Sequence, residues 1–184
     1  MRRLPSRPSP TPRRIPVQDT VPTAVRHALW VNASPGFQTL SMALRYSQYL
    51  APQAGWYEEY WAALQVRGPW TSNDFVQVWA GDGMAGRAWW RHLDDGHSPW
   101  ALVGSLGALI GTETFRRVYH DTAGAVSHGH QARYFYLGGQ GRGGIRWAGS
   151  EGWIAEGGLE LDLRIPSVIA WFDPGVYIQV GWQF

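Results

Sequence analysis

Apart from Ile154, residues 152–165 alternate apolar with polar or small side chains over fourteen positions, an arrangement that only an extended strand can sort onto two faces. One face carries Trp153, Ala155, Gly157, Leu159, Leu161, Leu163 and Ile165, and the other carries Glu156, Glu160, Asp162 and Arg164. At a rise of about 3.3 Å per residue the run spans about 46 Å, which exceeds the usual strand of a soluble domain. The pattern therefore predicts a long strand with one apolar and one charged face.

The rest of the body has the same period. Alternating runs occupy residues 39–46, 56–67, 73–79 and 99–110, and helical periodicity is hard to find. Turn residues separate them at 34–36, 51–55, 68–69, 81–83, 94–96, 138–144 and 173–175. Residues 84–98 fit neither pattern and are expected to form a loop or one helical turn. The prediction is an all-β, antiparallel up-and-down meander barrel of about eight to twelve strands.

Composition divides the chain into a leader and one domain. Six prolines and five arginines lie within residues 1–23, which are expected to form a disordered basic leader without the apolar segment of a normal secretory signal. Residues 24–184 form the barrel domain. Without the first fourteen residues, 11 arginines face 14 acids, so a nucleic-acid surface spread over the fold is not expected. The chain has no cysteine, which excludes disulfides and thiolate metal sites.

The last ten residues place an unbroken apolar row on one strand face. The row consists of Val176, Ile178, Val180, Trp182 and Phe184, and glutamine, glycine and tyrosine lie between them. This ending resembles the C-terminal insertion signal of bacterial outer-membrane β-barrel proteins. The resemblance implies a location in the bacterial outer membrane, with its lipid and the barrel-assembly machinery as partners.

A second resemblance rests on the aromatic segments at residues 55–60 and 86–90 together with the final strand. Their order is similar to the C-terminal barrel of tetratricopeptide-porin proteins, which export polysaccharide or serve as phage receptors. No helical repeat precedes these segments, so the chain is expected to be a barrel-only relative or the C-terminal barrel of a larger protein. The implied function is a passive pore or export channel for polysaccharide or a small solute, or a surface receptor.

A membrane barrel would turn its polar row toward the lumen. The residues expected there are Arg133, Arg146, Glu156, Glu160, Asp162, Arg164, Gln179 and Gln183. On this interpretation Leu161→Arg blocks insertion or folding, whereas Asp162→Asn is mild.

No catalytic residue and no cofactor are predicted. The candidate metal ligands are His128 and His130, with His120 or Asp121 as a third, and loop or lumen positions explain them better. The pairs His97-Ser98 and Ser127-His128 point to opposite faces of a strand and cannot act as base and nucleophile. The glycine-rich segment 138–144 lacks the lysine of a phosphate loop and is expected to be a hairpin turn or flexible loop.

The tryptophans support an alternative from another class. A soluble β-sandwich could bind carbohydrate on a platform of Trp56, Trp61, Trp79, Trp89 and Trp90, since indole rings stack on sugars. The missing secretory signal favours this alternative, and the terminal strand disfavours it.

Overall fold

A computed structural model describes residues 26–50, 53, 55–69, 76–94, 98–120, 126–149, 151–167 and 170–184. The predicted leader, residues 1–23, lies outside the described residues. Within the described part, no helix is long and apolar enough to cross a membrane.

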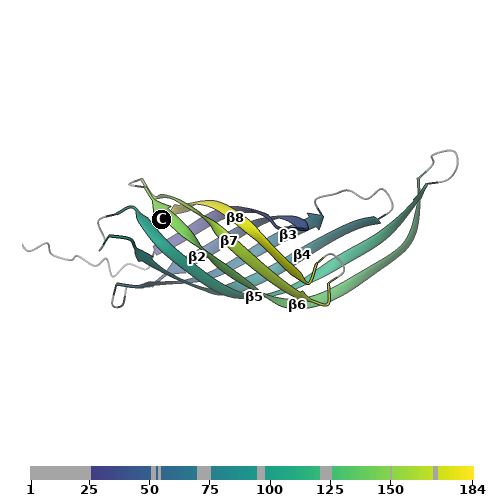
Figure 1. The fold of residues 1–184 in the computed structure, drawn as a ribbon, viewed down its shortest axis with the longest axis horizontal. Helices are drawn as coiled ribbons and strands as arrows, with labels where there is room; N and C mark the ends of the chain where they lie inside the picture. Colours follow the sequence, from purple (N-terminus) through teal and green to yellow (C-terminus); the bar gives the residue numbers. More distant parts are fainter. Residues whose placement is uncertain are drawn as a thin grey trace, which may run out of the picture.

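Eight antiparallel strands close into a single barrel, in which each strand pairs with its neighbour in sequence and β1 pairs with β8 (Figure 1). The strands are β1 Arg26–Pro35, β2 Thr39–Tyr49, β3 Tyr57–Pro69, β4 Val76–His92, β5 Trp100–His120, β6 Val126–Ala148, β7 Trp153–Ile165 and β8 Phe172–Gln183. Hydrogen bonds between His27 and Phe184, in both directions, extend the closing ladder to the last residue. The predicted up-and-down barrel is therefore confirmed, at the lower end of the expected strand number.

A closed barrel overturns the β-sandwich alternative. The five tryptophans proposed as a sugar platform are divided between the two sides of the wall: Trp61 is buried inside, whereas Trp56 and Trp79 are exposed outside. Alternation along each strand separates them, so they cannot form one platform.

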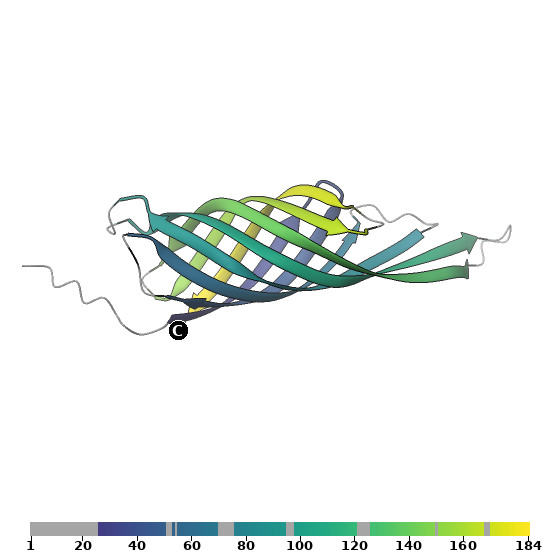
Figure 2. The same ribbon diagram turned by 90° about the horizontal axis from the view of Figure 1, so that it is seen from below.

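The two ends of the barrel differ. The terminal end carries Arg26 and Phe184, and at the opposite, distal end β5 and β6 run on well past the other strands (Figures 1 and 2). The ladder between β6 and β7 stops at Leu137 and Ile165, and the ladder between β3 and β4 stops at Arg67 and Ala80. Residues 76–79 of β4, 112–120 of β5 and 126–135 of β6 thus form a three-stranded extension, named here the distal sheet.

Four segments predicted to be turns lie within strands instead: residues 68–69 in β3, 81–83 in β4, 138–144 in β6 and 173–175 in β8. Residues 84–92, expected to be a loop or helical turn, also belong to β4. Crowding inside a small barrel explains the glycines. A Cβ on Gly107 would lie 2.5 Å from the Trp61 ring, and one on Gly144 would lie 2.3 Å from the carbonyl oxygen of Gly157. In these strands glycine leaves space for large side chains that point inward and lets neighbouring backbones approach closely. It does not mark a turn here.

Candidate functional site

The outward face of the barrel is apolar between two aromatic zones. Leu64, Ile110 and Ile178 are exposed near the middle, at 60% or more of their surface. Exposed aromatics occupy both ends: Trp56, Tyr60, Trp100, Trp153, Trp182 and Phe184 toward the terminal end, and Phe37, Trp79, Phe135, Trp171 and Phe172 toward the distal end. Such a band between two aromatic girdles is typical of a barrel surrounded by lipid.

The five residues of the predicted insertion signal all lie on this outward face. Val176, Ile178, Val180, Trp182 and Phe184 are 41–69% exposed, and they alternate with the buried Tyr177 and Gln179. Trp182 packs edge-to-face on Trp153 of β7, with ring centroids 5.1 Å apart. No second sheet or helix covers this row in the described residues, so its environment in a membrane would be lipid.

The lumen is filled by charged side chains. Five arginines and seven acids are buried among the described residues, namely Arg45, Arg67, Arg142, Arg146, Arg164, Glu59, Asp82, Glu113, Glu156, Glu160, Asp162 and Asp173. Eight strands leave an interior just wide enough for side chains to fill. The polar row of each strand therefore forms the core.

A four-member chain of charges lies toward the terminal end. Glu59 of β3 accepts hydrogen bonds from Arg45 of β2 at 2.6 Å and from Arg146 of β6 at 2.8 Å. Arg146 also binds Glu156 of β7, with its Nη2 2.7 Å from Oε2, and Glu156 accepts a hydrogen bond from the Tyr177 hydroxyl at 2.9 Å. Positive and negative groups alternate, so each buried charge has an opposite neighbour.

Aromatic rings enclose this chain. The Arg146 guanidinium lies over the rings of Trp30, Trp90 and Tyr49 at 5.1, 5.3 and 5.8 Å, and the Arg45 guanidinium lies 4.7 Å from the centroid of Trp61. Tyr57 stacks on Trp90 at 4.0 Å. Cation–π contacts stabilise guanidinium groups that have lost water, and the rings fill the remaining width of the lumen at the terminal end.

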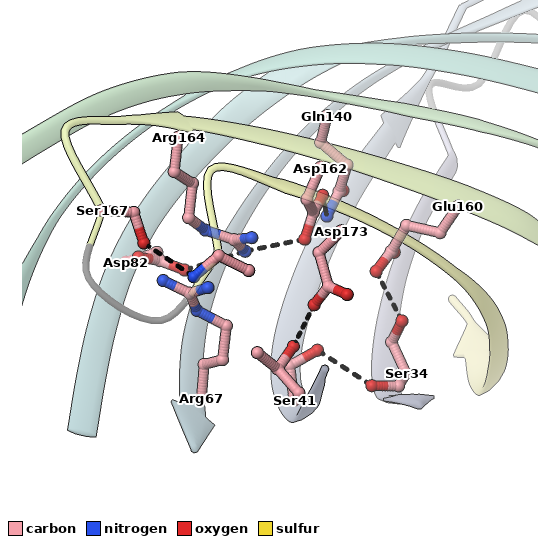
Figure 3. A network of polar contacts seen from close by, with 12 residues as sticks. Ser34, Ser41, Arg67, Asp82, Gln140, Glu160, Asp162, Arg164, Ser167 and Asp173 are labelled. Atoms are coloured by element: carbon pink, nitrogen blue, oxygen red, sulfur yellow. Dashed lines mark hydrogen bonds and ion pairs between the residues drawn. The ribbon is translucent and has the colours of Figure 1, made fainter. Parts of the chain in front are cut away.

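A second group of charges lies toward the distal end, where Arg67 and Arg164 approach one another with Asp82 beside them (Figure 3). Arg164 donates to Asp162 at 2.7 Å and lies 3.4 Å from Asp82, and Arg67 lies 3.5 Å from Glu113. Three carboxylates thus face two guanidinium groups. This group of five residues has one more negative than positive member.

Between these two groups, Glu160 of β7 connects its own strand with β1 and β6. It receives a hydrogen bond from Ser34 of β1 at 2.5 Å and forms an ion pair with Arg142 of β6. Arg142 also lies 4.8 Å from the Tyr177 ring of β8. Contacts that cross the lumen in this way connect strands that are not neighbours in the sheet.

Six of the eight residues predicted to face the lumen are buried there: Arg146, Glu156, Glu160, Asp162, Arg164 and Gln179. Gln183 is half-buried at the end of β8. The prediction that Arg133 faces the lumen is wrong. Arg133 is exposed and shares its strand face with Phe135 and Leu137, which point outward.

Four residues that face the lumen were not predicted from the sequence, namely Arg45, Glu59, Arg67 and Glu113. For Glu59 and Arg67 the signal was present, since both share the strand face opposite Leu64 and Val66.

The candidate metal ligands are not tested by this arrangement. His120 lies in β5 and His128 and His130 lie in β6, but their side chains are outside the described part of the structure. Among the described residues, no group of three or more histidine, aspartate or glutamate side chains is placed to hold a metal ion.

Comparison with known proteins identifies the fold. No family model and no curated protein matches the sequence. A major outer membrane protein of Thermus thermophilus superposes with a TM-score of 0.63 at 7% identity, covering 88% of this chain and all of that one. Ail, the attachment invasion locus protein of Yersinia pestis, superposes with a TM-score of 0.53 at 10% identity, covering 87% of this chain and 97% of that one. The chain thus has the fold of the small β-barrels of bacterial outer membranes.

Proposed function

We propose that this protein is an outer-membrane barrel that displays its distal sheet at the cell surface as a receptor and does not conduct solutes. The observation that carries the proposal is the packed lumen: eleven of its twelve described charges lie in ion pairs, and aromatic rings fill the space around Arg146. A pore lined by mobile, hydrated side chains would leave these groups exposed. Passage of polysaccharide or small solutes, the other function expected from the sequence, would require the whole core to rearrange.

The asymmetry of the two ends supports an orientation. In outer-membrane barrels the long connections between strands face the outside of the cell, and the short turns face the periplasm. Here the extended β5–β6 hairpin is at the distal end, and both Arg26 and Phe184 are at the other. We therefore place the distal sheet outside the cell and the terminal end in the periplasm.

Conductance measurement tests the proposed function. Purified full-length protein, first shown to be folded by its heat-dependent shift in gel mobility, is expected to give no stable current steps in a planar bilayer. The physical reason is that ions cannot pass a core of close-packed, paired side chains. Stable steps whose size changes in Arg164→Gln would assign conduction to this lumen and overturn the proposal.

We further propose that the barrel-assembly machinery recognises the outward row that ends at Phe184. Phe184→Ala is expected to reduce insertion severalfold in cells, while folding of the purified variant into detergent micelles stays close to normal. The difference arises because a recognition signal is needed only where the machinery acts. Phe37→Ala is the matched control, since Phe37 is also exposed but lies at the distal end. Equal loss in both variants, or loss in detergent as well, would contradict this role.

A further inference from the structure

Two arginines of the distal sheet face outward and have no acidic partner among the described residues. Arg116 of β5 and Arg133 of β6 form no ion pair with this part of the chain, in contrast to the five arginines of the lumen. Arg133 is exposed and Arg116 is half-buried. Both lie on the strand face that carries Ile110 on β5 and Phe135 on β6, which is the lipid side of the wall.

The strand register brings the two guanidinium groups within reach of one ligand. Arg133 pairs with Thr114 and Arg116 pairs with Gln131, so the arginines are diagonal neighbours on adjacent strands. Diagonal neighbours are about 7–8 Å apart at the backbone, a separation that two arginine side chains can bridge. The register shifts directly after Arg116, between Arg116 and Val118, and bulges of this kind re-aim side chains. Two guanidinium groups carried by diagonal neighbours favour an oxyanion such as phosphate, which each can bind with two parallel hydrogen bonds.

The position of the pair selects the source of that phosphate. Arg133 is two residues further from the barrel than Phe135, a girdle residue exposed at 73%. Two residues of a strand span about 6–7 Å. This distance takes Arg133 from the aromatic girdle, at the edge of the hydrocarbon, to the level of the lipid headgroups.

Charge also distinguishes the two ends. The described acids that lie outside the lumen, Glu58, Asp94 and Glu151, are all at the terminal end. At the distal end, the described acids Glu113 and Asp173 are buried in the lumen. The described outward face there is therefore positive, and anionic headgroups attract such a surface.

We propose that Arg116 and Arg133 together bind a phosphate group on the headgroup of an anionic lipid in the outer leaflet. The inference rests on the proposed function for its orientation, because the distal end must face outside for the pair to meet that leaflet. The lipid would anchor the base of the distal sheet, where β6 has no β7 partner beyond Leu137. Bound lipid would thus stabilise the distal sheet, the part of the molecule that is displayed at the cell surface.

Lipid titration with native mass spectrometry tests the proposal on the full-length protein in neutral detergent. The probes are diphosphoryl lipid A and the same lipid with its phosphates removed, which differ only in the groups that the arginines would bind. Wild type is expected to retain the phosphorylated lipid at least tenfold more tightly. The double variant Arg116→Gln with Arg133→Gln is expected to lose about tenfold in affinity for it and to bind both lipids alike.

Arg91→Gln provides the matched control, because Arg91 is an exposed arginine of β4 at the terminal end. It is expected to leave lipid retention unchanged. Equal retention of the two lipids by wild type, or an equal loss in the control, would overturn the proposal. Inorganic phosphate bound as tightly as the lipid would mark a general oxyanion site and would also overturn it.

The gel-shift assay for folding is run on every variant, so an unfolded variant cannot be mistaken for a lipid-binding defect. Conductance is measured separately. A conducting barrel that retains phosphorylated lipid through these arginines would contradict the display function and leave the lipid site standing.

Discussion

Leu161→Arg is expected to prevent stable insertion of the barrel. Leu161 is 42% exposed near the middle of the outward row of β7, between Leu159 and Leu163, which are also exposed. An arginine on the lipid face at the bilayer midplane costs about 2–4 kcal/mol, a large share of the roughly 5–15 kcal/mol by which a typical protein is stable. The folded fraction in phospholipid vesicles, read from the heat-dependent gel shift, should fall severalfold or more.

Asp162→Asn is the matched control on the adjacent residue, which faces the lumen. Asp162 receives hydrogen bonds from Arg164 at 2.7 Å and from Gln140 at 3.0 Å. The change is expected to be mild for two reasons: Arg164 keeps Asp82 as a partner, and this end of the lumen has more acids than arginines. If both variants insert equally well, lipid does not surround the outward face of β7.

The expected insertion defect follows from alternation, the feature of the fold that the sequence displays most directly. Which face of β7 is polar can be decided by counting from Glu156, because side chains alternate strictly along a strand. The closed topology follows nearly as directly from many consecutive alternating runs. Neither step needs knowledge of contacts between distant residues.

The glycines and the lumen partners depend on such contacts and were therefore harder to predict. Gly144 looks like a turn residue until the backbone of the neighbouring strand, with the carbonyl oxygen of Gly157, is placed beside it. Glu59 and Arg146 are 87 positions apart in sequence, so local patterns do not indicate their pairing. Arg133 was misassigned for a related reason: no alternating run of charges surrounds it, and its face is set by the register with β5.

Glu59→Gln is expected to destabilise the barrel more than the removal of other single charges in the lumen. Glu59 is fully buried and forms ion pairs with both Arg45 and Arg146. Arg146 would retain Glu156, but Arg45 has no other ion pair with a described residue. Removing one partner of a buried pair typically costs about 3–5 kcal/mol, because the other charge stays buried without compensation. The urea midpoint of unfolding in lipid vesicles should fall clearly, with little change in slope.

Glu58→Gln separates this effect from a general loss of negative charge at the start of β3. Glu58 is the preceding residue and points outward, where it pairs with Arg87 at 2.6 Å while both side chains remain a third or more exposed. An ion pair in contact with solvent contributes little, so the midpoint for this variant should stay near that of wild type. The double variant Glu59→Gln with Arg45→Met then tests the mechanism, because it removes the uncompensated charge together with its partner. Recovery of most of the lost stability is expected, and a further decrease would show that Glu59 stabilises the barrel in some way other than by pairing with Arg45.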